Sequence, residues 1–286
     1  MQALRNVIED YKKQSRALGH FNISDSNQLE AIARASKETK LPTIVALSEG
    51  ERAFFPISHA KALVDIYNEE GAQLYLSADH TYSVDKVEAA LHDGVDAVVV
   101  DGAQHLFEEN VALVRQCVAL GKAQNRDILV EGELGYIGTS STVLSKLPEG
   151  VAITEDMMTQ PDKLNEFVLQ TGIDLAAPSV GNVHGIVTTG QPKLAIDLIE
   201  RLAQMVDVPL VLHGGSGSSD EEFVNAVTAG ISIIHINTSI RLIYRDGLQK
   251  SITDHPDVVA PYKFIEPVVV ELQAYIAQKM HLFARS

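Results

Sequence analysis

The sequence predicts a (β/α)8 barrel, also called a TIM barrel, and three observations lead to this prediction. Short apolar segments of strand length recur eight times along the 286 residues. Most are followed by an amphipathic segment of helical length, and several of these end in glycine, as helices commonly do. No linker or low-complexity segment interrupts the alternation, so we expect a single domain over residues 1–286. An open doubly wound sheet is the alternative, but it rarely needs eight strands, and the first strand is not followed by GxGxxG.

The expected elements follow one another in regular order. The eight strands are expected at residues 19–23, 42–48, 73–80, 97–102, 127–135, 174–185, 209–217 and 233–239. The clearest helical patterns lie at residues 26–40, 83–94, 110–124 and 220–230, and the N-terminal 21 residues also have helical periodicity.

Two segments depart from the repeat. Residues from about 135 to 160 are too long for an ordinary strand-to-helix connection, so we interpret them as an extended loop that covers the site or contacts the substrate. Residues from about 262 onward form an apolar helical tail after the last strand. This tail can pack on its own barrel or on a partner subunit, and the second possibility suggests a homo-oligomer, a dimer or a tetramer.

Composition and charge exclude several classes of protein. The formal net charge is −15 and the pI is near 5.0, which disfavours nucleic acids and anionic membranes as partners but leaves a small phosphorylated substrate possible. The one cysteine, Cys117, cannot form an intramolecular disulfide or a cysteine-rich zinc site, which suits a reducing cytoplasm. No segment approaches the roughly 18 apolar residues of a membrane span.

Polar side chains stand at the carboxyl ends of almost all expected strands. In a barrel these ends meet at one mouth, where the chemistry of such folds takes place. A lone histidine in an apolar segment is more often a hydrogen-bonded core residue than a ligand. Three of the ten histidines end expected strands, however, and together they predict a zinc site with an open coordination position. The polar residues at strand ends are Asn22, Ser48, Asp79, His80, Asp101, Glu131, Glu133, His184, His213 and Asn237, of which His80, His184 and His213 are the predicted ligands.

Asp79 directly precedes His80 in the segment QLYLSADH. If the strand continued through both, their side chains would point to opposite faces, whereas both reach the mouth if the strand ends there. An N-cap of the following helix is another possible role for Asp79, but Ser83 is better placed for it. Asp79 is therefore our candidate for proton transfer. His20 lies early in the first strand, and we expect it to pack at the lower end of the barrel.

Two turns rich in small residues indicate an anion site. HGGSGSSDEE places His213 before Gly214, Gly215 and Ser216 and then opens a helix, and INTS places Asn237 and Thr238 after the eighth strand. Backbone N–H groups at a helix N-terminus bind anions, and barrels often hold phosphate after strands seven and eight. The sequence GGSG also occurs in ordinary tight loops. The prediction of an anion site therefore depends on the position of both turns after expected strands seven and eight.

Five motifs occur in the same order as in one known family. VEGELGYIG, GNVHG, VLHGGSG, the INT after the last strand, and the Asp-His that ends strand three together resemble the class II, metal-dependent ketose-bisphosphate aldolases, and GHFNISD and SEGER are also similar to that family. The resemblance implies a TIM barrel that cleaves fructose or tagatose 1,6-bisphosphate, with Zn²⁺ on His80, His184 and His213.

The resemblance also implies roles for further residues. Asp79 would act as acid and base at the C4 hydroxyl, and Asp101 and Glu133 correspond to positions where some members place a second metal. A monovalent cation, Na⁺ or K⁺, would lie near Gly185 and Gly214. The residues implied for substrate and phosphate are Ser48, Gly185, Gly214, Gly215, Ser216, Asn237 and Thr238.

Two of the departures of this chain from the family pattern affect the predicted site. Ser140 and Ser141 stand where members commonly have acidic residues, so the group that protonates the enediolate is unassigned, and Glu149 and Glu155 are possible substitutes. His235 stands where the family usually has asparagine; we expect Asn237 to bind phosphate and keep His235 as a second candidate.

The chemistry also separates this prediction from its rivals. A Schiff-base aldolase needs a lysine at the barrel mouth, and none of the thirteen lysines lies in or at the end of an expected strand. A metal-dependent barrel hydrolase typically has an HxH pair on strand one, where only His20 is present. A barrel that binds sugar phosphates without catalysis is the third possibility, which the retention of Asp79 disfavours. We therefore expect a zinc-dependent fructose-1,6-bisphosphate aldolase, with a tagatose-bisphosphate or other ketose-phosphate aldolase as the alternative.

Overall fold

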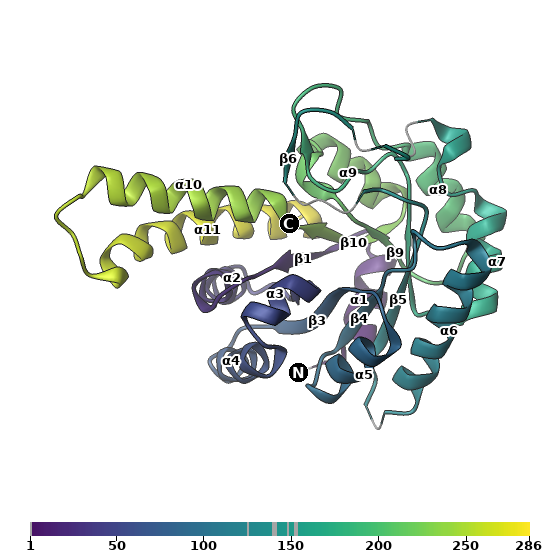
Figure 1. Cartoon of the computed structure of the whole chain (residues 1–286), viewed down its shortest axis with the longest axis horizontal. Coiled ribbons are helices and arrows are strands. Elements are labelled where there is room, and N and C mark those ends of the chain that lie inside the picture. The colour runs from purple at the N-terminus through teal and green to yellow at the C-terminus, as the bar shows by residue number, and fades with distance from the viewer. Residues whose placement is uncertain (1, 125, 139–141, 148, 152–153) are drawn as a thin grey trace.

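Eight parallel strands of the computed structural model close into a barrel, which confirms the predicted fold (Figure 1). The structure describes residues 2–124, 126–138, 142–147, 149–151 and 154–286. Around the barrel the strands follow the order β1-β10-β9-β7-β5-β4-β3-β2. They are β1 (Leu18–Asn22), β2 (Thr43–Leu47), β3 (Leu74–Thr81), β4 (Ala97–Val100), β5 (Leu129–Leu134), β7 (Leu175–Pro178), β9 (Leu210–Leu212) and β10 (Ile231–Ile236).

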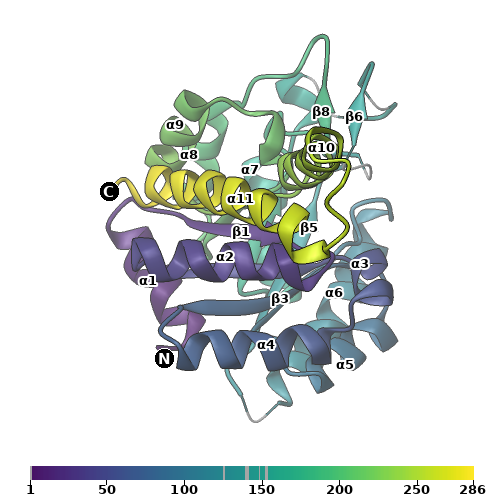
Figure 2. The ribbon, with the colours of Figure 1, turned by 90° about the vertical axis from the view of Figure 1, so that its left-hand side faces the viewer.

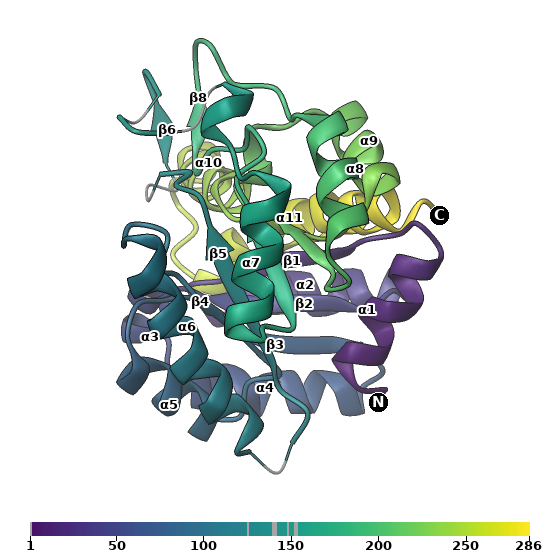
Figure 3. The ribbon, with the colours of Figure 1, turned by 90° about the vertical axis from the view of Figure 1, so that its right-hand side faces the viewer.

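Helices cover the outside of the barrel, as Figure 3 shows for α5, α6 and α7. Local signals fix several of their ends: the Asp25 side chain accepts hydrogen bonds from the N–H groups of Asn27 and Gln28 and caps α2, and Gly172 ends α7 with φ +69°. The helices are α1 (Leu4–Lys13), α2 (Ser26–Thr39), α3 (Glu49–Phe54), α4 (Ile57–Glu69), α5 (Val84–His92), α6 (Phe107–Lys122), α7 (Pro161–Thr171), α8 (Ile196–Met205), α9 (Asp220–Ala229), α10 (Thr238–Asp254) and α11 (Pro261–Ala284).

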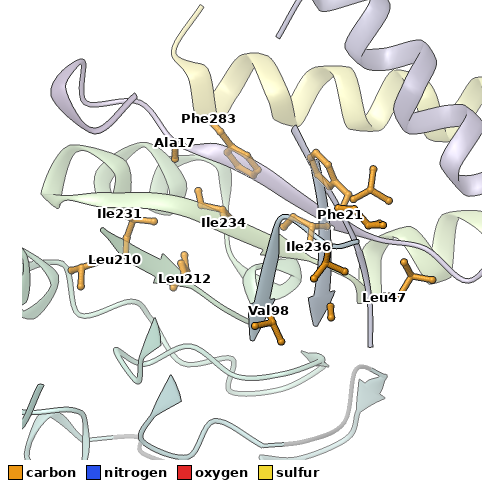
Figure 4. Packing of buried hydrophobic residues seen from close by; sticks show 14 of the residues in the cluster. Ala17, Phe21, Leu47, Val98, Leu210, Leu212, Ile231, Ile234, Ile236 and Phe283 are labelled. Atoms are coloured by element: carbon orange, nitrogen blue, oxygen red, sulfur yellow. The ribbon is translucent and has the colours of Figure 1, made fainter. Parts of the chain in front are cut away.

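The hydrophobic core has two parts, which lie on opposite faces of the strands. The outer part lies between strands and helices and includes Phe21, Ile234, Ile236 and Phe283 (Figure 4). The inner part fills the lower end of the barrel, where α1 packs against it. We call its strand residues the lower layer: Leu18, Ile44, Tyr75, Ala97, Leu129, Leu175, Ala177, Val211 and Ile233. This apolar floor supports the polar residues above it.

The long connection after β5 contains secondary structure of its own. Within it, β6 (Val143–Leu144) pairs in parallel with β8 (Ile186–Val187), which follows β7, and a short 3₁₀ helix, η1, spans Glu155–Met157. A second 3₁₀ helix, η2, spans Gly215–Gly217 after β9. The predicted extended loop is thus tied to the segment that carries His184.

The last two helices form an arm that projects from the barrel. Figure 1 shows α10 and α11 running side by side away from the strands, and Figure 2 shows α11 lying next to α2. The predicted C-terminal helical tail corresponds to α11, which begins at Pro261. In the described part of the chain, no helix combines the length and the apolar character that crossing a membrane requires.

Candidate active site

The end of β3 brings both Asp79 and His80 to the barrel mouth. The pairing of β3 with β4 shifts register between Ala78 and Thr81, and His80 has φ +37°, a left-handed backbone that a non-glycine residue seldom adopts. This irregularity ends the alternation of side chains, so both residues line the same cavity. Ser83 is the N-cap residue of α5, as predicted, which leaves Asp79 available for chemistry.

The three predicted metal ligands lie together above this point. The ring centroids are 4.8 Å apart for His80 and His184, 5.1 Å for His80 and His213, and 5.8 Å for His184 and His213. One nitrogen of each ring faces a hydrogen-bonding oxygen. His80 Nδ1 lies 3.0 Å from a carboxylate oxygen of Asp101, and His184 Nδ1 lies 2.6 Å from the carbonyl oxygen of Gly138. His213 Nε2 lies 2.6 Å from a carboxylate oxygen of Glu131. Such contacts orient imidazoles that use the other nitrogen for a metal.

The remaining nitrogens and the surrounding charge fit a divalent cation. His213 Nδ1 is buried with no hydrogen-bond partner among the described residues, and it lies 3.5 Å from Glu133 Oε2, which also has none. Burial lowers the pKa of His184 and of His213 to about 3, so both are neutral and able to coordinate. Burial also opposes charge on His80, but Asp79, Asp101 and Glu133 outweigh it and raise the pKa of His80 to about 10, so positive charge is favoured here.

Asp79 is held by one oxygen and free at the other. Its Oδ2 accepts a hydrogen bond of 2.8 Å from Asn22 Nδ2, which also donates to Glu51 at 3.0 Å. Its Oδ1 is buried without a partner in the described structure, 3.8 Å from His80 Nε2. Burial alone would raise the pKa of Asp79, but the neighbouring histidines and the Asn22 amide outweigh burial and lower it, so Asp79 is ionised at neutral pH. A fixed carboxylate with one unengaged oxygen is suited to accept a proton.

Glu51 and Arg52 support Asp79, a role that the motif SEGER alone did not predict. The Arg52 guanidinium donates to the carbonyls of Leu47 and Asp79 at 2.7 and 2.8 Å and to the Thr81 hydroxyl at 3.1 Å. These bonds join the ends of β2 and β3 and hold the backbone on both sides of His80. Glu51 accepts from the Ser48 N–H at 2.7 Å and from Arg241 at 2.7 Å. The available signal was their position in the short helix α3, which follows the end of β2.

His20 and His235 lie beside the site, and the expectation that His20 packs at the lower end of the barrel was wrong. His20 pairs with His235 across β1 and β10, and one nitrogen or carboxylate oxygen from each of His20, Asp79 and His235 lies within 4.8 Å of the others. The strand begins two residues before His20, at Leu18, and Leu18 rather than His20 belongs to the lower layer. Burial lowers the pKa of His20 to about 4 and that of His235 well below its usual value, so both imidazoles are neutral.

The two glycine-rich turns surround the cavity that contains Asp79. Gly214 has φ +64°, and a Cβ there would lie 2.3 Å from the Val183 carbonyl, so only glycine lets this turn approach the His184 segment. Gly215 is buried against the His235 carbonyl. The cavity has a volume of about 20 Å³, room for about one water molecule. It is lined by Asn22, Asp79, His80, His184, Gly185, Gly214, Ser216, His235, Asn237 and Thr238.

A second cavity of about 140 Å³ adjoins the first and shares His80, His184 and Asn237 with it. Ser48 and Asp101 line this cavity together with Glu49, Tyr82 and Arg241. Glu133 lies with His80 and Asp101 in a group that could hold a cation; Asp101 and Glu133 are the residues predicted for a second metal.

The acidic residues considered for the loop do not meet the cavities described above. Ser140 and Ser141 lie outside the described residues. Glu155 pairs with Arg201, and Glu149 is exposed and lines neither cavity.

A barrel with three convergent histidines, a fixed carboxylate and a glycine-rich turn has the groups that a metal-dependent lyase or hydrolase would need. Comparison with known proteins decides between these. The family model described as fructose-bisphosphate aldolase class-II matches residues 2–286, so the chain belongs to this family.

Relatives with assigned names are similar over almost the whole chain. A fructose-bisphosphate aldolase of Geobacillus stearothermophilus is 31% identical, with 99% of this chain and 97% of the relative covered. The D-tagatose-1,6-bisphosphate aldolase subunit GatY of Klebsiella oxytoca is 27% identical, with 97% and 95% covered. The crystal structure of the YdjI aldolase from Escherichia coli K12 superimposes with a TM-score of 0.82 at 26% identity, covering 98% of this chain and 96% of that one.

Proposed function

We propose that this protein is a zinc-dependent aldolase that reversibly cleaves fructose 1,6-bisphosphate into dihydroxyacetone phosphate and glyceraldehyde 3-phosphate. One observation carries the proposal: three histidine nitrogens converge beside the free oxygen of Asp79, within reach of a glycine-rich turn. Family membership supports the reaction type.

The residues of the chain divide the work of cleavage among them. Gly214, Ser216 and Thr238 would bind the phosphate of the three-carbon half and fix that end of the substrate. Asp79 Oδ1 would accept the proton of the C4 hydroxyl as the C3–C4 bond breaks, and Asn22 keeps this carboxylate in place. His80, His184 and His213 would hold the zinc ion, which when bound supplies positive charge for the negative charge that develops on the ketone half.

Two sugar bisphosphates are candidate substrates. Fructose and tagatose 1,6-bisphosphate differ only in configuration at C4, the carbon whose hydroxyl faces Asp79 in this scheme. Relatives named for each substrate have similar identity to this chain, 31% and 27%. We favour fructose because its bisphosphate is the commoner substrate of central metabolism, and tagatose 1,6-bisphosphate or another ketose phosphate is the alternative.

The test is an assay coupled to triose-phosphate release, run with both bisphosphates. Activity should disappear with EDTA and return with Zn²⁺, and the ratio of kcat/KM values should identify the sugar. Mg²⁺ added after EDTA is the control, because a site of three imidazoles prefers Zn²⁺ to Mg²⁺. Full activity in EDTA, with atomic absorption showing a metal-free protein, would exclude the metal-dependent mechanism.

We also propose that the protein forms a homodimer or tetramer through the α10–α11 arm. The arm exposes apolar side chains at Ile252, Val259, Tyr262 and Val270, with exposed fractions of 52%, 88%, 72% and 51%. Light scattering after gel filtration should give the molar mass of an oligomer. The double variant Val259→Asp, Tyr262→Asp should give a mass closer to that of the monomer. A wild-type monomer at micromolar concentration would contradict this proposal.

A further inference from the structure

Three imidazoles form a stacked column inside the barrel. The His20 and His235 rings are 3.4 Å apart and inclined by 5°, and the His235 and His213 rings are 4.0 Å apart and inclined by 21°. His20 and His235 are only 2% and 5% exposed. The column therefore runs from a buried position on β1, through β10, to a proposed metal ligand that directly follows β9.

Two members of this column have polar atoms that the proposed metal site does not use. Both nitrogens of His20 and Nε2 of His235 lack a hydrogen-bond partner among the described residues. A buried polar group without a partner costs about 1–3 kcal/mol, so two such imidazoles reduce stability, and a role for their stacked ring faces would account for their presence.

A second metal ion is one conceivable occupant, because His20, Asp79 and His235 lie close enough to share a cation. The stacking opposes it. The lone pairs of an imidazole lie in the ring plane, so an ion shared by two parallel rings 3.4 Å apart would lie outside the plane of at least one of them. The arrangement is better suited to fix the plane of one ring by means of the other.

The location of His235 indicates what it contacts. Its Nδ1 is 3.6 Å from Asp79 Oδ1, and its Nε2 is 3.9 Å from Glu131 Oε2, so the ring lies between the proposed base and the carboxylate behind His213. His235 and Asn237 both line the first cavity; His235 lies on β10, and Asn237 follows the strand as the N-cap residue of α10. With a substrate bound as in the proposed function, it would face the atoms between the phosphate and the metal.

We propose that His235 is a substrate-contacting residue for the oxygen atoms of the three-carbon half, and that His20 is a positioning residue that fixes the His235 ring by stacking. The inference rests on the proposed aldolase function and adds the group that recognises the carbons next to the phosphate. His20 acts through its ring face, so its nitrogens are dispensable.

The experiment uses zinc-loaded protein and two probes, inorganic phosphate and phosphoglycolohydroxamate, an analogue of the enediolate of dihydroxyacetone phosphate. His235→Ala should weaken hydroxamate binding in calorimetry by about 10- to 100-fold, as the loss of a hydrogen bond to a charged group does. Phosphate binding should be unchanged, because the glycine-rich turn is intact. Ser232→Ala, a buried residue of the same strand outside both cavities, is the control and should change neither.

Variants of His20 separate stacking from a chemical role of its nitrogens. His20→Ala should lower kcat and hydroxamate affinity less than His235→Ala does, and it should add nothing in the His235→Ala background. His20→Phe retains a ring and should restore most of the loss in any variant that circular dichroism shows to be folded. Zinc content by atomic absorption should be the same in all variants.

Each contrary result has a definite meaning. Loss of one zinc equivalent in His20→Ala would replace this inference with a second metal site. Unchanged hydroxamate affinity in His235→Ala, with an active wild type, would overturn the inference alone. A wild type that neither cleaves ketose phosphates nor binds the hydroxamate would overturn the proposed function, and the inference would fall with it.

Discussion

The lower and upper halves of the barrel interior are built on the same strands and have opposite character. On β10, Ile233 belongs to the apolar floor and His235 lines the cavity; on β5, Leu129 belongs to the floor and Glu131 contacts His213. We call the inward polar residues above the floor the upper layer: His20, Asn22, Asp79, Glu131, Glu133, His213 and His235.

On one strand, inward side chains two residues apart thus belong to the apolar core and to the site, respectively. Side chains two positions apart share a face of a strand, so the barrel can place both layers on each strand without altering its hydrogen bonding. Substitutions in the lower layer should therefore reduce the free energy of unfolding without affecting turnover. Substitutions in the upper layer should reduce turnover without affecting the free energy of unfolding.

The largest effect is expected from Asp79→Asn in the upper layer. The amide keeps the volume and can still accept from Asn22, but it cannot take up a proton, so kcat should fall by about 10²- to 10⁴-fold. Calorimetry should show that phosphate still binds, as the glycine-rich turn is unaltered. Full turnover in this variant would remove Asp79 from the mechanism, and loss of phosphate binding would indicate a folding defect instead.

Ile233→Ala tests the lower layer. Ile233 is 1% exposed, and truncating such a side chain leaves a cavity that costs about 2–5 kcal/mol in the free energy of unfolding. Urea denaturation measures this loss, while kcat at low temperature should match the wild type. A large fall in kcat in the folded variant would show that the two layers are not independent.

The sequence predicted the barrel well because its strands are apolar segments separated by amphipathic helices. The predicted strand ends were less accurate where an apolar segment continues past the strand. Residues 174–185 were predicted as one strand, but β7 ends at Pro178 and a buried loop continues to His184. Burial, not strand structure, produced that pattern.

The candidate site was predictable where function requires a particular residue type at a strand end, as for His80 and Asp79. The roles of Arg52 and the His20–His235 stack could not be predicted, because they depend on contacts between strands that are distant in sequence. Which face of β1 lies beside which residue of β10 is set by the closure of the barrel.

Arg52→Lys tests whether the upper layer needs support from outside the barrel interior. A lysine ammonium cannot reproduce the fork that bonds Leu47, Asp79 and Thr81, so the backbone at His80 should relax and misplace Asp79. We expect kcat to fall by about 10- to 100-fold and the zinc affinity to weaken. Arg126→Lys is the control, because Arg126 also donates to backbone carbonyls but lies away from the site. An equal loss in both variants would mean a general effect on folding.

The smallest effect concerns pH and Glu131. Burial raises the pKa of Glu131 from an ordinary 4.5 to about 8, so the folded chain binds its proton more tightly than the unfolded chain does. Such a group stabilises the fold fully below pH 4.5, and this contribution is lost as the pH rises through 8. In metal-free protein, the free energy of unfolding should therefore fall over this range more steeply for the wild type than for Glu131→Gln, which has no proton to lose. Parallel curves for the two proteins, measured by urea denaturation at each pH, would show that Glu131 is already ionised in the fold. The His213 contact would then be a charged hydrogen bond, and the upper layer would contribute to stability as well as to function.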